Sequence, residues 1–255
     1  MLKKRLIFSL LFDNGNFFLS RNFKLQKIGN FEWLKKNYNF TLIAKSVDEI
    51  NILDVSRDKQ DIKNFCNTIR KFTKNCFIPL SVGGKVDSID KAKYYLDSGA
   101  DKLIINSELF NLKLIQNLSK NFGEQCLIGS LDYKYVNDEI FCFKKNGSKK
   151  LNMNLSKIFK LMESLPIGEV ILNSIDRDGT GFGFDFKILN YFPKEFKKPL
   201  IFSGGAGNYK HLLEAFNNKQ IDGIATANLL NFVGDGLQEA RLLLSKNGVK
   251  LAEWL

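Results

Sequence analysis

Apolar residues along the chain fall into short runs that alternate with segments of helical periodicity. The runs predict eight strands, near residues 5–11, 50–54, 78–82, 102–106, 126–131, 169–174, 199–203 and 222–226. The periodic segments predict eight helices, near residues 31–40, 59–74, 88–98, 108–121, 154–165, 185–192, 208–218 and 235–247. Such alternation of strand and helix is typical of parallel βαβ units. Most of the strands are apolar throughout, which indicates that both faces of the sheet are covered.

The two halves of the chain resemble each other at an offset of about 120 residues. Leu6–Leu11 aligns with Leu127–Asp132, and Val82–Gly84 aligns with Ser203–Gly205. A period of this length holds four βα units, which is half of an eight-unit barrel. We therefore predict a single (β/α)8 TIM barrel over residues 1–255, with half-barrels at about 1–122 and 123–255. An open doubly wound sheet is the alternative, but it gives no reason for the repeat.

The chain carries a formal net charge of +11, from 38 Lys and Arg against 27 Asp and Glu. A basic excess attracts phosphates, acidic metabolites or nucleic acid. The lysines are dispersed along the whole chain, with no block of five basic residues. A phosphorylated small molecule is therefore favoured as a ligand, and no nucleic-acid partner is expected.

Cysteine and histidine are too sparse and too scattered to predict a metal centre. Cys66, Cys76, Cys126 and Cys142 show no C-x-x-C spacing, and His211 is the only histidine. The pattern predicts inert thiols in a reduced compartment, with no metal and no cofactor. The apolar run after Lys3–Arg5 is too short for a signal peptide, and no run reaches the length of a membrane span. We expect a cytoplasmic protein with no membrane partner.

Two Gly-Gly turns follow the third and seventh predicted strands. Glycine lets backbone N–H groups approach an anion, and the next helix N-terminus adds a favourable dipole. In each half, the repeat pairs the turn with the end of the next strand, where further amides are placed to close an anion nest. We predict two phosphate sites, half a barrel apart, that include Gly84, Lys85, Asn106, Ser107, Gly204, Gly205, Ala227 and Asn228. Tight βα turns also use glycine for steric reasons alone.

The loop after the sixth predicted strand, Ile175–Gly181, holds two acids, one base and two glycines. Loops at the carboxyl ends of barrel strands carry the chemistry of (β/α)8 enzymes. Together with Ser203–Gly207, His211–Phe216 and Gly99–Lys102, this loop resembles the cyclase subunit of imidazole glycerol phosphate synthase, the HisF family. The resemblance covers nearly the whole chain, and it adds Asp178 and Gly179 to the candidate phosphate-binding residues.

The resemblance implies a barrel with a class I glutaminase subunit docked at its N-terminal face. Ammonia made by that partner passes through the barrel to a bisphosphorylated ribulosyl formimino substrate, closes an imidazole ring and releases aminoimidazole carboxamide ribotide. The family's ring of four charged residues at the ammonia entrance matches Arg5, Glu49, Lys102 and Glu169. Each lies at the start of a predicted strand, where two cations and two anions can neutralise one another. A stabilising polar layer on the barrel floor is the other interpretation.

The catalytic end departs from the family. Of the two aspartates that the family uses as general acid and base, Asp132 is present, but Leu11 occupies the position on the first strand. A positioned acid or base typically accelerates a reaction by about 10²-fold to 10⁴-fold. We therefore predict impaired cyclisation unless Asp13 takes over the proton transfer. Lys85 replaces a family glycine, and the family's phosphate-loop lysine falls on Leu19.

Three functions fit these residues. The first is the cyclase of histidine biosynthesis, with Asp132 doing most of the proton transfer. The second is an ammonia-conducting subunit with a weakened cyclase step, which works beside a sugar amidotransferase in surface-glycan synthesis, as in a paralogous branch that the chain resembles. The third is the related sugar-isomerase barrel of the same pathway, which needs no ammonia entrance. Entrance residues retained beside a missing carboxylate favour the second.

Overall fold

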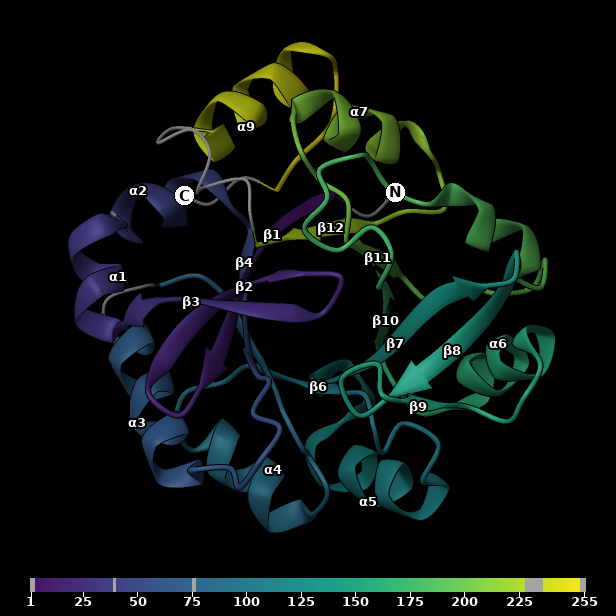
Figure 1. The fold of residues 1–255 in the computed structure, drawn as a ribbon, viewed down its shortest axis with the longest axis horizontal. Helices are drawn as coiled ribbons and strands as arrows, with labels where there is room; N and C mark the ends of the chain where they lie inside the picture. The colour runs from purple at the N-terminus through teal and green to yellow at the C-terminus, as the bar shows by residue number, and fades with distance from the viewer. Residues whose placement is uncertain (1–2, 39, 75–76, 228–235, 253–255) are drawn as a thin grey trace.

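The computed structural model describes residues 3–38, 40–74, 77–227 and 236–252. Eight parallel strands form a closed barrel, in the order β10, β11, β12, β1, β4, β5, β6 and β7, and β7 pairs with β10 to complete the ring (Figure 1). The strands are β1 (Arg5–Asp13), β4 (Glu49–Asp54), β5 (Leu80–Gly83), β6 (Lys102–Ile105), β7 (Leu127–Val136), β10 (Glu169–Ser174), β11 (Leu200–Ser203) and β12 (Gly223–Thr226). Each overlaps a predicted strand, which confirms the (β/α)8 barrel.

Helices surround the barrel in the same order as the strands (Figure 1). They are α1 (Phe31–Asn37), α2 (Phe40–Ser46), α3 (Ile62–Thr73), α4 (Ile89–Leu96), α5 (Leu112–Phe122), α6 (Leu155–Ser164), α7 (Tyr209–Asn217) and α9 (Gly236–Lys246), with 3₁₀ turns η1 (Glu124–Cys126) and η2 (Phe186–Tyr191). Polar side chains cap the first turns of most of them, as Asp61 does for α3 and Ser88 does for α4. Such caps satisfy backbone N–H groups that have no partner within the helix.

Two predicted helices differ from the structure. The segment 31–40 is not one helix, because Tyr38 adopts an extended backbone that separates α1 from α2. The segment 185–192 is the 3₁₀ turn η2, confined between the capping side chain of Asp185 and Pro193. Short segments of this kind take the tighter 3₁₀ form more readily than an α-helix. Residue 235, at the predicted start of the last helix, lies outside the described residues.

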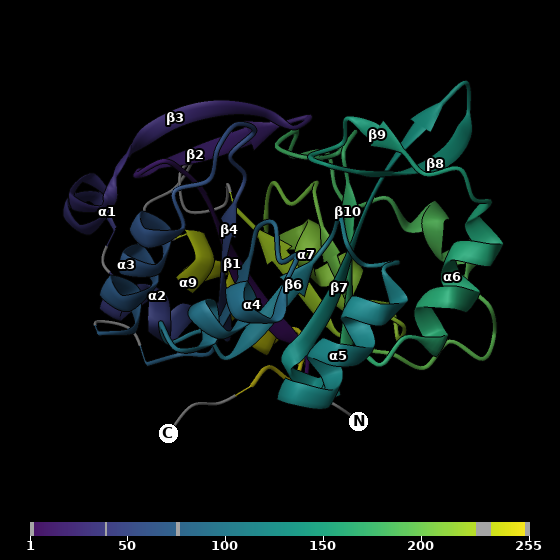
Figure 2. The same cartoon turned by 90° about the horizontal axis from the view of Figure 1, so that it is seen from below.

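Two hairpins that the periodicity did not predict lie at the same end of the barrel (Figure 2). They are formed by β2 (Asn16–Arg21) with β3 (Lys24–Asn30), and by β8 (Glu139–Lys144) with β9 (Lys149–Lys150). Strand β1 turns into β2 through Asn14 and Gly15, whose φ angles are 43° and 85°. Positive φ at both central residues is the geometry of a tight hairpin turn, and Asn-Gly is its strongest sequence signal.

The half-chain repeat reappears as matched contacts. Leu80 N donates to Asp101 Oδ2 at 2.8 Å, and Leu200 N donates to Asp222 Oδ2 at 3.1 Å. In both halves an aspartate between two strands therefore fixes the start of the preceding strand. The sequence repeat thus corresponds to a repeated structural unit.

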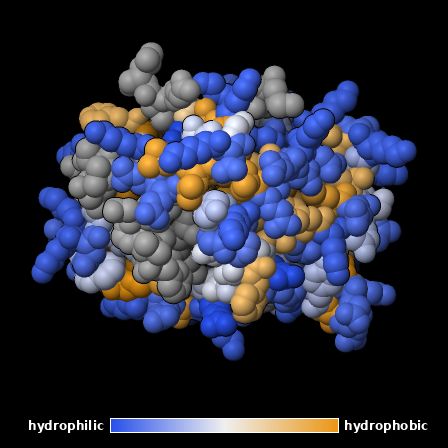
Figure 3. Space-filling model, turned by 90° about the horizontal axis from the view of Figure 1, so that it is seen from above, coloured by the Kyte–Doolittle hydropathy of each residue, from blue (hydrophilic) through white to orange (hydrophobic). Residues whose placement is uncertain are grey.

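The barrel interior and the layer between barrel and helices are separate cores. The larger core packs the outward side chains of the strands against the helices. The smaller one fills the lumen with Ile7, Ile104, Ile128, Ile171, Ile201 and Ala225. The face of the molecule in Figure 3 is mainly hydrophilic, with hydrophobic residues showing between the hydrophilic ones. Among the described residues, no helix combines the length and apolar character needed to span a membrane.

Candidate functional site

A ring of four charged side chains closes the N-terminal end of the barrel. Arg5 Nη1 lies 2.6 Å from Glu49 Oε1, and Arg5 Nη2 lies 2.8 Å from Glu169 Oε2. Lys102 Nζ lies 2.7 Å from Glu169 Oε1 and 3.5 Å from Glu49 Oε1. The structure therefore brings together all four residues that the sequence assigned to the entrance, each from the first position of its strand.

The ring is electrostatically balanced, with two cations and two anions. Burial would raise the pKa of Glu169, but its hydrogen bonds and its attraction to Arg5 and Lys102 hold that pKa below its ordinary value. Burial likewise works against the charge of Arg5, and the two glutamates more than compensate, so its pKa is raised. The ring thus favours the charged forms of Arg5 and Glu169, and its longest ion pair is that of Lys102 Nζ with Glu49 Oε1, at 3.5 Å.

Asp132 lies at the opposite end of the lumen, on β7, and is only 5% exposed. Its Oδ2 accepts a hydrogen bond of 3.0 Å from Asn106 Nδ2, and its Oδ1 accepts one of 3.4 Å from Asn173 Nδ2. Burial raises the pKa of Asp132 to about 7, although the two asparagine donors favour the ionised form. A carboxyl group with this pKa can both donate and accept a proton near neutral pH.

Asn173 was missed by the sequence analysis, and Asn106 was assigned there to a phosphate site. In the structure, the Asn106 side-chain amide donates to Ser130 O at 3.1 Å as well as to Asp132. The two asparagines position the carboxylate from the two sides of β7: Asn173 on β10 is the direct register partner of Asp132, and Asn106 directly follows the last residue of β6. The signal available in the sequence was an amide side chain at the end of each neighbouring strand.

Leu11 and Asp13 share one face of β1. The strand pairs with β2 without interruption through Leu11, Phe12 and Asp13. Phe12 points outward, where its ring packs 5.5 Å from that of Phe17, so the residues on either side of it face the lumen. The structure thus settles the direction of Asp13, which the sequence left open.

Asp13 carries a partly buried carboxyl group near the mouth of the barrel. Its Oδ1 is buried and has no hydrogen-bond partner among the described residues. Burial and the charges of Asp54 and Asp58 raise the pKa of Asp13, and Lys85 opposes them. A carboxyl group is therefore present on the lumen face of β1, two residues after Leu11 and closer to the mouth of the barrel.

The residues predicted to bind phosphate in the first half are already engaged within the chain. Lys85 adopts a left-handed backbone with a φ of 51°, and its Nζ donates to Asp58 O at 2.6 Å. Gly84 has a φ of 127°, and a Cβ there would lie 2.5 Å from Asp54 Cβ. Ser107 Oγ accepts a 3.2 Å hydrogen bond from Lys145 N, in the β8–β9 turn. The role of these groups in binding phosphate stays a prediction.

In the second half, the predicted residues pack against neighbouring loops. Gly204 and Gly205 adopt φ angles of 88° and 119°, and a Cβ on Gly205 would lie 2.1 Å from Gly183 O. Ala227 is partly buried at the end of β12, and Asn228 lies outside the described residues. Glycine is sterically required at this turn, and phosphate binding by Gly204, Gly205, Ala227 and Asn228 stays a prediction.

Asp178 and Gly179 lie beneath the turn of the β2–β3 hairpin. Asp178 Oδ2 accepts hydrogen bonds from Ser20 Oγ at 2.5 Å and Phe23 N at 3.0 Å. A Cβ on Gly179 would lie 2.0 Å from Ser20 O. Burial raises the pKa of Asp178, and the two donors oppose the shift. The carboxylate therefore fastens the hairpin over the barrel mouth in this structure, and phosphate binding by this pair stays a prediction.

The β8–β9 hairpin closes the mouth from the other side. Asn146 Nδ2 donates to Val55 O at 3.2 Å, and a Cβ on Gly147 would lie 3.0 Å from the Phe23 ring. Arg57 Nη2 donates to Phe23 O at 2.9 Å. The two hairpins therefore meet above the carboxyl ends of the strands, where barrel enzymes hold their substrates.

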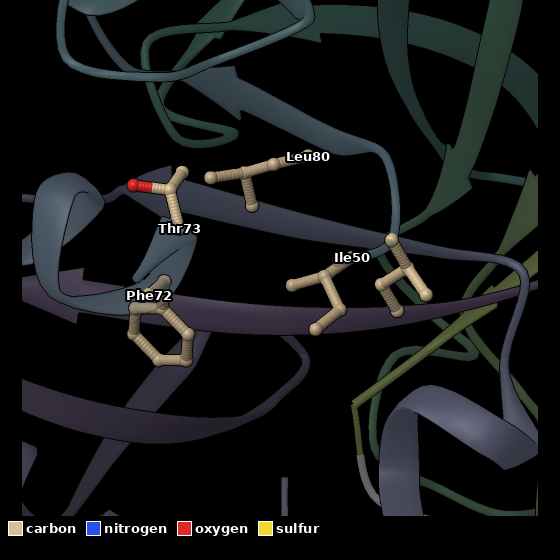
Figure 4. A pocket seen from close by; sticks show the side chains of 5 residues that line it. Ile50, Phe72, Thr73 and Leu80 are labelled. Carbon is tan, nitrogen blue, oxygen red and sulfur yellow. The ribbon is translucent and has the colours of Figure 1, made fainter. Parts of the chain in front are cut away.

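A small cavity of about 10 Å³ lies outside the barrel wall, between β4, β5 and α3 (Figure 4). Ile50, Phe72, Thr73, Ile78 and Leu80 line it. Its volume is that of a single water molecule and its lining is mostly apolar, so it is not a substrate site. Within the described part of the chain, no group of three or more His, Cys, Asp or Glu residues is placed to hold a metal ion.

Comparison with known proteins identifies the barrel. Residues 36–234 match the family described as Histidine biosynthesis protein. The chain is 42% identical over 256 residues to the "Putative imidazole glycerol phosphate synthase subunit hisF2" of Parasynechococcus marenigrum, covering 100% of this chain and 95% of that protein. It is 34% identical over 208 residues to "Imidazole glycerol phosphate synthase subunit HisF" of Hydrogenobaculum, covering 80% and 82%. With the protein of the same name from Chloroherpeton thalassium it shares 32% identity over 253 residues, covering 98% and 99%. The chain therefore belongs to the HisF family of histidine-biosynthesis (β/α)8 barrels.

Proposed function

We propose that this chain is the ammonia-receiving, HisF-type subunit of a glutamine amidotransferase complex, and that its cyclase step is weakened. One observation carries the proposal. The four-residue ring at the N-terminal end is complete, with contacts of 2.6 to 3.5 Å, whereas Leu11 occupies the lumen position of a proton-transfer group at the other end.

The ring suits the entry of ammonia. It has no net charge, so it neither attracts nor repels a neutral molecule of this size. Entry requires at least one ion pair to separate, and the pair of Lys102 with Glu49, at 3.5 Å, is the longest. Above the ring, the isoleucines of the lumen exclude ions, because an unpaired charge is strongly disfavoured there. Ammonia, unlike ammonium, crosses such a layer at little cost.

The partner on this reading is a class I glutaminase of the HisH type, docked over the ring at the N-terminal face. The ammonia acceptor lies at the carboxyl end, where the net charge of +11 and the glycine-rich turns favour a phosphorylated small molecule. With the cyclase step weakened, we propose that ammonia is passed on to a sugar amidotransferase that acts in surface-glycan synthesis. The working compartment on this proposal is the cytoplasm.

Asp132 retains part of the family's chemistry. Its pKa of about 7 leaves it half ionised near neutral pH, so it can take up a proton from an attacking amine and return it to a leaving group. Asp132 supplies only one of the two positioned carboxyl groups that the family uses. Loss of the other should slow the cyclase reaction by about 10²-fold to 10⁴-fold.

A second candidate function is a working cyclase, and Asp13 favours it. Its carboxyl group lies on the same face of β1 as Leu11, and its buried Oδ1 has no partner within the described residues. In this alternative Asp13 supplies the second acid or base, and the product is imidazole glycerol phosphate.

Turnover of the family's bisphosphorylated substrate with excess ammonium salt separates the two candidates. We expect the wild type to turn over this substrate about 10²-fold to 10⁴-fold more slowly than Leu11→Asp, because that variant restores the missing carboxylate. A fast wild type that Asp13→Asn inactivates establishes the cyclase instead. Binding of a class I glutaminase, measured by sedimentation, tests the shared part of the proposal, and the absence of a complex refutes it.

A further inference from the structure

The outer end of β7 and the hairpin that follows it form a small sheet above the barrel, and one face of that sheet continues from Asp132 (Figure 2). Lys134 lies two residues after Asp132 on β7, so the two side chains share a face. Phe143 is the register partner of Asp132, and Phe141 is the register partner of Lys134. Lys150 on β9 is in turn the register partner of Phe143. Directly opposite residues of antiparallel strands point to the same side, so all five side chains lie on one face.

The opposite face of this sheet is part of the core between the barrel and the helices. Tyr133 and Cys142, which alternate with the residues of the first face, are 1% and 2% exposed and belong to that core. The face that carries Asp132 and Lys134 is therefore the one that a ligand at the barrel mouth can reach.

The two lysines of this face are held on aromatic rings. Lys134 Nζ lies 4.6 Å from the centroid of the Phe143 ring, and Lys150 Nζ lies 3.1 Å from the centroid of the Phe141 ring. Each lysine thus crosses β8 diagonally, and the attraction between ammonium group and ring favours that position. Within the described part of the chain, neither ammonium group forms an ion pair with a carboxylate. Two positive charges are therefore positioned on this face without a paired counter-charge.

The charge of the hairpin favours an anionic ligand. Residues 134–150 carry five lysines and two acidic residues. The two acids, Asp138 and Glu139, lie at the turn between β7 and β8, at the far end of the sheet from Lys150. Lysines on an edge strand also discourage pairing with other chains, which is another explanation of the β9 lysines. That explanation gives no reason for two ammonium groups to be held on rings beside the Asp132 face.

Two of the groups that the sequence assigned to the first phosphate site are engaged within the chain. Ser107 Oγ accepts a hydrogen bond from Lys145 N, in the turn of the same hairpin, and Lys85 Nζ donates to Asp58 O. The hairpin turn therefore packs against the region where that site was predicted. Lys134 and Lys150, in contrast, keep their ammonium groups available to a ligand.

We propose that Lys134 and Lys150 form a site for the phosphoryl group of the small molecule that binds at the barrel mouth, on the sheet face that continues from Asp132. The inference rests on the function proposed above, which places a phosphorylated ligand there, and it specifies how that ligand lies. Two residues of a strand span about 7 Å, so a ligand whose phosphoryl group contacts Lys134 meets the Asp132 carboxyl group with atoms about 7 Å away. Lysine binds phosphate as a point charge with three N–H donors.

The test is an NMR titration of the intact, isotope-labelled chain with inorganic phosphate and with ribose 5-phosphate, followed at the backbone amide signals of Lys134 and Lys150. Sodium chloride at equal ionic strength is the reference. Lys134→Gln and Lys150→Gln each remove one ammonium group, and Lys134→Arg retains both the charge and a side chain that stacks on a ring. Lys149→Gln is the matched control, because Lys149 is the neighbouring exposed residue of β9 and points to the other face.

We expect both probes to move the two amide signals to saturation, and sodium chloride to leave them in place. Lys134→Gln and Lys150→Gln should each weaken the binding about tenfold, the equivalent of one charge-assisted hydrogen bond. Lys134→Arg should retain the affinity within about threefold. Lys149→Gln should change it by less than about twofold, because salt screens a charge on the far face. Ribose 5-phosphate should bind more tightly than inorganic phosphate, because its sugar can extend toward Asp132.

Three results overturn the proposal. Amide signals that follow total salt, or a loss of affinity in Lys149→Gln as large as that in Lys134→Gln, would show a diffuse positive field and no site. Shifts confined to Gly84 and Gly204 would place phosphate at the glycine turns instead. Equal affinity for the two probes would show a site for the free ion alone.

These outcomes are independent of the glutaminase-binding measurement. A chain that binds a glutaminase but no phosphate at the hairpin keeps the ammonia-receiving function and loses this inference. A chain that binds phosphate at Lys134 and Lys150 but no glutaminase keeps the anion site, and the function proposed above then fails.

Discussion

The buried carboxyl group of Asp132 should make the stability of this protein depend on pH in a way that Asp132→Asn abolishes. In the folded chain its pKa is about 7, whereas an ordinary aspartate has a pKa of 3.8. Each pKa unit corresponds to about 1.4 kcal/mol, so ionising Asp132 in the folded state costs about 4 kcal/mol relative to the unfolded chain.

The sign follows from proton binding. The folded state holds this proton more tightly than the unfolded state does, so this residue lowers stability as the pH rises from about 4 to about 7. Above about pH 7 both states are ionised and the loss is complete. Asparagine has no such proton, so the advantage of Asp132→Asn over the wild type should grow by about 4 kcal/mol between about pH 4 and pH 8.

Urea denaturation of both proteins at several pH values measures this difference directly. Asp138→Asn is the matched control, because Asp138 is exposed in the β7–β8 turn and loses the same charge. Asn106→Ala removes a donor that favours the ionised form, so it should move the midpoint to higher pH. The reasoning is refuted if the gap between Asp132→Asn and wild type is the same at all pH values, or if it shrinks as the pH rises.

The remaining predictions concern the ring and the turns. Glu169→Gln should cost about 2 kcal/mol at neutral pH, between the values for exposed and buried ion pairs, as measured by urea denaturation. Because the pKa of Glu169 is lowered in the fold, this advantage of the wild type should vanish as the pH falls below about 4, and a gap that persists in acid would contradict it. Gly205→Ala should lower the free energy of unfolding by at least about 2 kcal/mol, since its Cβ would lie 2.1 Å from Gly183 O. Gly248→Ala is the control, because Gly248 has a φ of 79° but open space around the position of a Cβ. Equal losses of unfolding free energy in the two variants would show that the contact with Gly183 O plays no part.

The β2–β3 and β8–β9 hairpins were not predicted from the hydrophobic periodicity of the sequence. The Asn14-Gly15 pair is a strong hairpin signal, and Asn137-Asp138 adopts the same left-handed geometry. A search for βα alternation treats such segments as loops, because their strands do not belong to the barrel. Their consequence is functional: through Ser20 and Phe23, the first hairpin binds the Asp178 carboxylate.

Asp13 and Asn106 show a different limit. The sequence placed Asp13 two residues after Leu11, but its direction depends on β1 continuing straight through position 13, which the pairing with β2 enforces. The sequence assigned Asn106 to a phosphate site. In the structure Asn106 directly follows β6, and its side-chain amide reaches Asp132 on the neighbouring strand β7, a contact that only the closed barrel sets.

The amino-acid sequence by itself determined the eight-stranded barrel, its half-chain repeat, the four residues that meet in the entrance ring and the replacement of a carboxylate by Leu11. The barrel and the repeat follow from local spacing, whereas the ring residues and Leu11 were recognised by the resemblance to the HisF family, whose positions they match. Only the tertiary structure decided which groups touch: that two asparagines hold Asp132, and that the hairpins occupy Asp178 and Ser107. The physical reason is that a hydrogen bond or a pKa depends on distance and burial, and strands far apart in the chain set both when the barrel closes.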